Sequence, residues 1–203
     1  MWLFVILTVV AGYLLGNLNG AVCVSHMLKD DVRTHGSGNA GLTNFIRSYG
    51  AQYALLVLAI DALKAVAACF VGGFVLDAYG LSLEGKALGG LAVMLGHVFP
   101  AFLGFRGGKG ILSGFFVALM VDWRIAALIL AVFAVAYLAT QYVSLGSVLA
   151  AAAYGIAFCI FHSDNLTVML CGIAMGLLAI FMHRQNIARL LKGEERKTDL
   201  FKK

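Results

Sequence analysis

Two short glycine-rich segments that also carry cations are the parts of this chain best suited to chemistry. The first, G-S-G-N-A-G, covers residues 36–41 and precedes Arg47, and the second, R-G-G-K-G, covers residues 106–110. Glycines let the backbone approach a ligand closely and adopt positive φ, so that successive N–H groups can point into one concavity that attracts phosphate. An arginine adds a bidentate fork for an anion. The two segments together predict an anion site.

Other kinds of site find little support in the sequence. Neither glycine-rich segment is a P-loop, because G-x-x-x-x-G-K-[ST] is absent. The four cysteines lie in apolar segments without the spacing of metal ligands, and we interpret them as buried small side chains: Cys23, Cys69, Cys159 and Cys171. The polar segments contain no D-x-x-D or similar carboxylate cluster. We therefore expect no metal site, no magnesium dependence and no cofactor.

The elements that must position these segments belong to a membrane protein. The chain has 203 residues, of which 62% are hydrophobic and only 12% charged, and this is more apolar surface than a soluble domain of that size can bury. A spanning helix needs about 20 apolar residues. The sequence predicts an all-α fold with seven such segments, the fourth of them short: Leu3–Val24, Tyr53–Phe74, Ala87–Leu103, Ile111–Val121, Ile125–Thr140, Leu145–Phe161 and Leu166–Met182.

The distribution of Lys and Arg predicts the orientation, since cytoplasmic loops carry the excess. With seven spans, one side holds twelve of the 15 cations and the other holds only Lys86 and Arg124. This places the N-terminus outside and the C-terminus in the cytoplasm, whereas a six-span alternative would lose the alternation. We expect one integral-membrane domain over residues 1–203. Its basic amphipathic tail, residues 183–203, is expected to lie on anionic lipids.

Several single residues have two interpretations. His97 can be a packing residue of its span or a catalytic one, because it lies nine residues before Arg106. Asp61 and Lys64 share one helix face, which favours a buried ion pair. His26, His35 and His162 are expected to be solvated at the membrane interface.

Four ordered motifs carry a resemblance that covers nearly the whole chain: G-S-G-N-A-G-L-T-N, G-H-V-F-P-A-F-L-G-F-R-G-G-K-G, Y-V-S-L-G-S and H-R-Q-N-I-A-R-L-L-K-G. Together they resemble the bacterial acyl-phosphate:glycerol-3-phosphate acyltransferase family, called PlsY. The resemblance implies transfer of an acyl group from acyl phosphate to the 1-hydroxyl of glycerol 3-phosphate. The products would be lysophosphatidic acid and phosphate, in the first step of phospholipid biosynthesis. It also implies a bacterial cell membrane, with the active site on the cytoplasmic side.

The resemblance assigns roles to residues of all four motifs. The catalytic candidates are His97, Ser37, Lys109 and Asn186. The substrate-binding candidates are Gly36, Gly38, Asn39, Thr43, Asn44, Arg47, Arg106, Gly107, Gly108, Ser144 and His183. Because acyl phosphate is a mixed anhydride with a good leaving group, no serine or cysteine nucleophile is required, and positioning and charge neutralisation can supply most of the rate. The proton of the attacking hydroxyl can pass to His97 or to a phosphate oxygen of the substrate.

This sequence departs from the family pattern at a few positions, namely Asn17, Asn19, Leu42, Ala65, Arg106 and Gln141. These changes affect helix packing and fine specificity more than the reaction, since both glycine-rich segments are intact. A transporter of an organic phosphate is the alternative from another class, but transporters show internal repeats, and none is visible here. A metal-dependent lipid transferase would need the missing carboxylate cluster. No nucleic-acid partner is expected.

Overall fold

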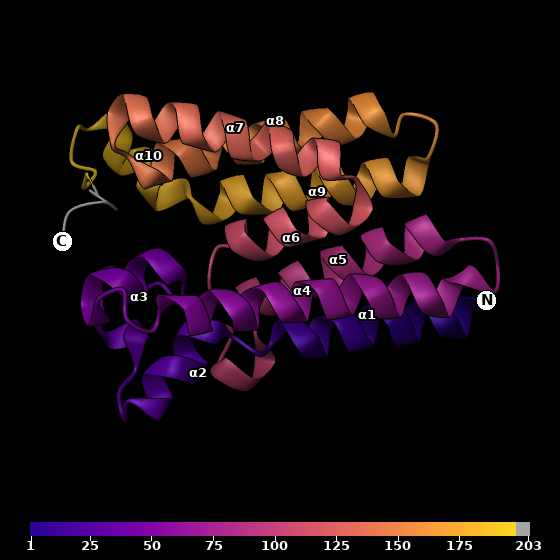
Figure 1. The fold of residues 1–203 in the computed structure, drawn as a ribbon, viewed down its shortest axis with the longest axis horizontal. Coiled ribbons are helices and arrows are strands. Elements are labelled where there is room, and N and C mark those ends of the chain that lie inside the picture. Colours follow the sequence, from indigo (N-terminus) through magenta and orange to yellow (C-terminus); the bar gives the residue numbers. More distant parts are fainter. Residues whose placement is uncertain (198–203) are drawn as a thin grey trace. The chain divides into compact units, whose positions relative to one another are not determined.

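The computed structural model describes residues 1–197, and every regular element within them is a helix (Figure 1). The all-α prediction is therefore confirmed. The helices group into two compact units, the first comprising Met1–Val121 and the second beginning at Asp122. That the whole chain acts as one membrane domain stays a prediction.

Three long helices run side by side in the first unit, and a shorter one packs against two of them (Figure 1). The long helices are α1 (Trp2–Gly16), α4 (Ala54–Asp77) and α5 (Ser82–Val98), and the short one is α6 (Ile111–Val121). Small residues allow this close packing, as is usual between membrane helices.

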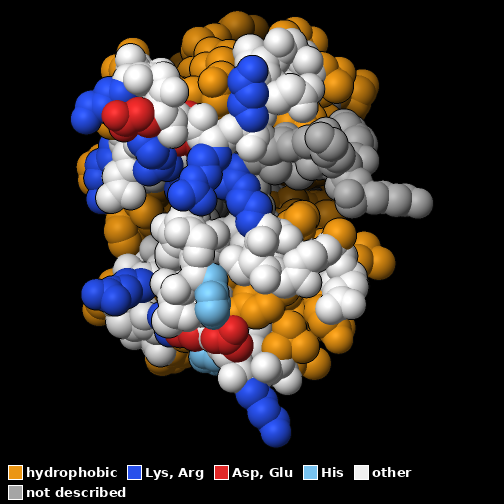
Figure 2. Space-filling model, turned by 90° about the vertical axis from the view of Figure 1, so that its left-hand side faces the viewer, with side chains coloured by type: hydrophobic (Ala, Val, Ile, Leu, Met, Phe, Trp, Pro, Cys, Tyr) orange, Lys and Arg blue, Asp and Glu red, His pale blue; other side chains and the backbone are white. Residues whose placement is uncertain are grey.

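Apolar side chains also cover the outside of this unit. Leu55, Phe70 and Phe74 of α4 are each more than 60% exposed. Polar residues gather instead at one end of the unit, which carries α2 and α3. The lower half of Figure 2 looks onto this end, where histidine, acidic and basic side chains are exposed while hydrophobic side chains line the flank. This distribution is that of a helical bundle whose sides face lipid and whose end faces water.

The first predicted span is not one continuous helix. Helix α1 ends at Gly16, and a separate helix α2 (Gly20–Met27) begins after a break at residues 17–19. Asn19 causes the new start, because its side-chain oxygen accepts a hydrogen bond from the N–H of Val22 at 3.0 Å and so caps α2. The predicted span near Leu3–Val24 is present as the stretch Trp2–Met27, but it is two helices and not one.

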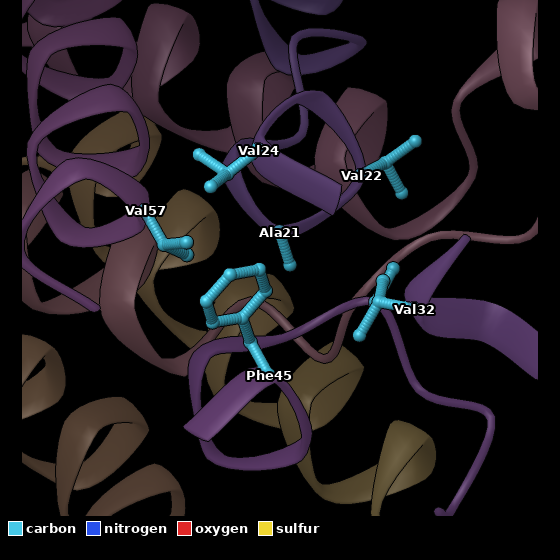
Figure 3. Packing of buried hydrophobic residues seen from close by; sticks show 7 residues of the cluster. Ala21, Val22, Val24, Val32, Phe45 and Val57 are labelled. Carbon is cyan, nitrogen blue, oxygen red and sulfur yellow. The ribbon is translucent and has the colours of Figure 1, made fainter. Parts of the chain in front are cut away.

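Residues 28–53 form an ordered cap on the polar end of the first unit, where the sequence indicated only a polar segment. The cap contains the short helix η1 (Val32–Thr34) and helix α3 (Leu42–Tyr49). The ring of Phe45 is fully buried against α2, η1 and the start of α4 (Figure 3). Its neighbours in this core are Ala21, Val22, Val24, Val32, Ala40 and Val57. Burying a phenylalanine contributes about 1.5–3 kcal/mol, so this core fixes the first glycine-rich segment to the bundle.

The second unit is a bundle of three long helices followed by a short one. They are α7 (Trp123–Thr140), α8 (Val143–Phe161), α9 (Leu166–Met182) and α10 (Arg184–Leu191). Helix α8 packs against both α7 and α9, and α10 folds back to contact α8 (Figure 1). Within the described part of the predicted amphipathic tail, residues 183–197, the helix is α10, and the last cations of the tail, Lys202 and Lys203, lie outside the described residues.

The helices divide into three classes by length and hydropathy. Five stretches, including the broken α1–α2 pair as one, are long and apolar enough to cross a membrane. Helices α9 and α10 form a sixth candidate only if this pair, bent by 54°, counts as one span. Helix α6 has 11 residues and is about 17 Å long at 1.5 Å per residue, roughly half of a bilayer core. The predicted count of seven therefore depends both on α6 and on counting the α9–α10 pair as a span.

Two predictions about single side chains need correction. All four cysteines are free thiols, but only Cys69 and Cys171 are buried, whereas Cys159 is exposed on α8. His162 was expected in solvent and is instead buried, with its Nε2 atom 3.3 Å from the Oδ2 atom of Asp122. His26 and His35 are exposed, as expected.

Candidate active site

The two glycine-rich segments meet at His97, in the last turn of α5. A methyl group built on Gly108 would collide with the Nε2 atom of His97 and would lie 2.7 Å from the carbonyl oxygen of Ala40. The N–H of Gly108 donates to the carbonyl of His97 at 3.1 Å. Position 108 therefore has no room for a side chain larger than the hydrogen of glycine. The imidazole edge of His97 and the two segments form one small polar centre inside the first unit.

The first glycine-rich segment is held in shape by Asn44 of α3. The Asn44 oxygen accepts from the N–H of Ser37 at 2.9 Å, and its amide donates to the carbonyls of Val32 and His35, both at 3.1 Å. Positive φ at Gly36 (58°) and at Gly38 (69°) lets the chain turn tightly around this side chain. Asn44 is buried and directs its hydrogen bonds to the loop backbone. In this structure Asn44 therefore stabilises the conformation of the first glycine-rich segment.

Residues 99–102, which precede the second glycine-rich segment, are hydrogen-bonded to the polar end of α1. The Tyr13 hydroxyl donates to the carbonyl of Phe99 at 2.8 Å, and the Asn17 oxygen accepts from the N–H of Phe102 at 3.1 Å. These bonds orient the turn η2 (Ala101–Leu103) that follows Pro100.

A third tether joins that turn to the cap. Arg33 donates from a guanidinium nitrogen to the carbonyl of Leu103 at 2.9 Å. The same side chain pairs with Asp31, the Nη2 to Oδ2 distance being 2.7 Å. Hydrogen bonds from Arg33 lower the pKa of Asp31 to about 2, so the carboxylate is ionised at neutral pH and holds Arg33 in place.

A buried ionic cluster lies behind His97. The Lys64 Nζ atom is 2.6 Å from the Oδ1 atom of Asp61 and 2.7 Å from the Nδ1 atom of His97. It also donates to the carbonyl of Leu18, in the α1–α2 break, at 2.6 Å. The side chains of Asp61 and Lys64 are at most 2% exposed. The predicted Asp61–Lys64 ion pair is confirmed, and it extends to His97.

The remaining candidates of the first unit are more exposed than this centre. Ser37, Arg47 and Arg106 are exposed, and Lys109 is half-buried. Thr43 and Asn39 are also half-buried, next to the buried Ala40. The backbone geometry is thus fixed from inside, while the cations and the Ser37 hydroxyl face the open side. This is the arrangement that an anion arriving from water requires.

The candidates from the last two motifs gather separately in the second unit. The Nδ1 atom of His183 lies 2.8 Å from the carbonyl oxygen of Ala179 and therefore carries its proton. The Asn186 amide donates to Oε1 of Glu195 at 2.8 Å, and Arg189 donates to Oε2 of the same carboxylate at 2.6 Å. Ser144 is buried in the first turn of α8.

Glu195 is the residue that organises this second group. Burial raises the pKa of Glu195, but hydrogen bonds from Asn186 and Arg189 outweigh it and leave the pKa below its usual value. The carboxylate is therefore ionised and ties the segment after α10 back onto that helix.

Sequence reasoning missed several residues that shape the site. Glu195 was read only as part of a charged tail, and Asn17 only as a departure from the family pattern. Asn19 was likewise read only as a departure, although its amide donates to the carbonyl of Ala40 at 3.0 Å. A usable signal existed for Asn19, since an asparagine followed by glycine inside an apolar run indicates a helix break with a cap. Nothing in the sequence indicated that Lys64 reaches His97.

The long apolar helices, whose outward side chains are apolar, define a multi-pass membrane protein. The sequence of residues 6–193 matches the family model described as glycerol-3-phosphate acyltransferase. The chain belongs to this family.

Individual relatives and solved structures agree with the family match. The glycerol-3-phosphate acyltransferase of Thermoanaerobacter pseudethanolicus is 37% identical over 196 residues, covering 96% of each chain. That of Clostridioides difficile is 38% identical over 196 residues, covering 96% of this chain and 95% of the relative. The crystal structure of PlsY, an integral membrane glycerol 3-phosphate acyltransferase, in its glycerol 3-phosphate form is 32% identical. It superposes with a TM-score of 0.84 over 98% of this chain and 99% of that one. A second crystal structure, the lysophosphatidic acid form, gives a TM-score of 0.80 at 31% identity and covers 96% of this chain and 95% of that one.

Proposed function

We propose that this protein transfers an acyl group from acyl phosphate to the 1-hydroxyl of glycerol 3-phosphate, giving lysophosphatidic acid and inorganic phosphate. The observation that carries the proposal is the meeting of two cation-bearing glycine-rich segments at His97. Both substrates are phosphorylated, and each segment offers backbone N–H groups with a cation nearby. Solved relatives crystallised in glycerol 3-phosphate and lysophosphatidic acid forms support the acceptor and the product.

The reaction needs positioning more than activation. The hydroxyl oxygen of glycerol 3-phosphate forms a bond to the acyl carbon, and the bond from that carbon to the phosphate oxygen breaks. The hydroxyl proton ends on the released phosphate. Holding the two substrates in an attacking geometry and neutralising the charge on the leaving phosphate can supply most of the rate enhancement.

The residues divide by position. Lys109 and Arg106, with the N–H group of Gly107, hold one phosphate. Arg47, with Ser37 and the 36–41 segment, holds the other. His97 contacts the reacting centre between them, and Asn44 shapes the loop. Asn186, Ser144 and His183 belong to the last two family motifs, and this resemblance alone makes them further candidates for contact with the substrates.

We further propose seven spans with the N-terminus outside and the C-terminus in the cytoplasm of a bacterial cell, with α6 as the short fourth span. The active site then faces the cytoplasm, and α10 lies on anionic lipids. Fusion of a reporter after Lys203 tests this orientation. A fluorescent protein that folds only in the cytoplasm should be bright and alkaline phosphatase inactive. The reverse pattern would refute the proposed topology.

The identity of the donor is tested with purified protein in detergent. We expect release of phosphate from palmitoyl phosphate only when glycerol 3-phosphate is also present, and at the same rate with or without a magnesium chelator. Palmitoyl-coenzyme A should give no product. Product from the thioester but not from the acyl phosphate would overturn the proposed donor.

Gly108→Ala is expected to lower kcat/KM at least about 100-fold, since the added methyl group would collide with His97 and displace it by about an ångström. Gly104→Ala is the matched control in the same loop, because a methyl group there meets no atom within 4 Å. Alanine at the positive φ of 64° of this position lowers the stability of the protein but does not displace any residue of the site. Equal activity of Gly108→Ala and the wild type would show that the reaction does not occur at this junction.

A further inference from the structure

Lys64 has all of its hydrogen-bonding capacity committed. An ammonium group has three donors and no acceptor, and Lys64 has three acceptors within 2.7 Å: the Leu18 carbonyl, the Asp61 carboxylate and the Nδ1 atom of His97. Asp61 also accepts from the N–H of Gly20 at 3.1 Å. One positive and one negative charge are thus paired in a site that excludes water. The histidine attached to them needs no charge of its own.

This count determines where His97 carries its proton. A nitrogen that accepts a hydrogen bond from an ammonium group has a free lone pair and no hydrogen. A neutral imidazole bears its single proton on the other nitrogen. His97 is therefore protonated on Nε2. That nitrogen is the one that a side chain at Gly108 would meet, so the N–H group faces the junction of the two glycine-rich segments.

An ion pair needed only for packing would not require this arrangement. Asp61 and Lys64 would satisfy each other without a histidine. The additional bond to Leu18 links the cluster to the α1–α2 break. The neighbours of Leu18 hold the two glycine-rich segments, with Asn17 bonded to Phe102 and Asn19 to Ala40. The orientation of His97 and the shape of both segments thus share one anchor.

We propose that Lys64 is a positioning residue, which with Asp61 and Leu18 fixes His97 as the Nε2–H tautomer so that it donates a hydrogen bond to the bound substrates. The proposal rests on the proposed function for the identity of those substrates. Lys64 itself touches no substrate. Its effect on the reaction passes through the ring of His97.

The tautomer is measured directly on the wild-type protein. Histidine labelled with ¹⁵N, in detergent micelles, gives correlations that distinguish a protonated from an unprotonated ring nitrogen, and His97→Gln identifies the signals. We expect His97 to show a proton on Nε2 and none on Nδ1. His183 is an internal reference with the opposite tautomer, because its Nδ1 faces a carbonyl. A proton on Nδ1 of His97 in the wild type would overturn the proposal, whatever the activity.

The variant for this test is the double substitution Asp61→Asn, Lys64→Met. It removes both charges at once, so that no uncompensated charge remains buried. We expect the Nε2–H signature to be lost or mixed and kcat to fall at least about 10-fold, as for other histidines deprived of an orienting partner. KM for glycerol 3-phosphate should change less than kcat. Lys86→Met, on the same unit but outside the cluster, should keep both the signature and the activity.

The outcomes separate the proposal from the proposed function. An unchanged tautomer in the double variant would overturn the role of Lys64, and so would a changed tautomer with unchanged kcat. Absence of acyl transfer in the wild type would instead refute the proposed function, while the ¹⁵N measurement would still decide the tautomer.

Discussion

Asp61→Ala is expected to make Cys69 react with a thiol reagent roughly 100- to 4,000-fold faster in detergent. The substitution leaves the ammonium group of Lys64 buried without its counter-ion, and the N–H of Gly20 without an acceptor. Breaking a buried pair in this way costs about 3–5 kcal/mol, and each 1.4 kcal/mol raises the open population about tenfold. Cys69 is fully buried on the same helix and reports this opening.

The design contains two controls. Cys171 is buried in the second unit, and its labelling should change less, because the lost interactions lie in the first unit. Asp77→Ala removes an exposed carboxylate from the same helix. Its free energy of unfolding should stay within about 0.5 kcal/mol of the wild-type value. If Cys69 of the Asp61→Ala variant is labelled at the same rate as in the wild type, the cluster contributes little to the stability of the fold.

His97→Ala is expected to lower kcat/KM about 100-fold, whereas His97→Gln should retain a clearly larger fraction of the activity. The physical reason is that His97 presents an N–H group to the site. Losing a hydrogen bond to a charged ligand costs about 1.5–3 kcal/mol. A glutamine amide can still donate there, but it cannot accept a proton as a general base. Steady-state rates of phosphate release measure both variants.

The comparison of these two variants identifies the proton acceptor. Equal losses in His97→Ala and His97→Gln would indicate that His97 removes the hydroxyl proton, contrary to the donor role. Retained activity in the glutamine variant leaves a phosphate oxygen of the substrate as the acceptor. His26→Gln is the matched control, because His26 is exposed. Its Nε2 atom lies 3.9 Å from the Oδ2 atom of Asp31, which is beyond hydrogen-bond distance.

The sequence predicted the helices better than their interruptions. Long apolar runs identified α4, α7, α8 and α9 to within a few residues, because hydropathy alone determines which segments can lie in lipid. The break at residues 17–19 escaped notice because it occupies three residues inside an apolar run, and its cause is a single asparagine cap. Helix α3 was hidden for the opposite reason, since its polar face reads as a loop.

The site was predicted in part for similar reasons. Glycine-rich segments with cations are recognisable by composition, so Ser37, Arg47, Arg106 and Lys109 could be named as candidates, and their roles stay a prediction. The contacts that shape the site join residues far apart in the chain, such as Lys64 with His97 and Asn19 with Ala40. No local pattern records such pairs. Asn44 was named as a substrate-binding candidate, but its hydrogen bonds go to the backbone of the loop. A polar residue in a motif can therefore stabilise the loop itself.

The most direct test of the central claim compares the wild type with the double variant Arg47→Ala, Lys109→Ala in one reaction. Palmitoyl phosphate and glycerol 3-phosphate are supplied, and lysophosphatidic acid and phosphate are both quantified by mass spectrometry and colorimetry. Lys192→Ala, Lys197→Ala serves as a control that removes two cations outside the glycine-rich segments. We expect equal amounts of the two products from the wild type and the control, and at least about a 1,000-fold loss in the double variant, because each phosphate loses one charged contact. Wild-type rates in the double variant, or no lysophosphatidic acid from folded wild-type protein, would contradict the account and would make uptake of phosphate esters into liposomes the next function to test.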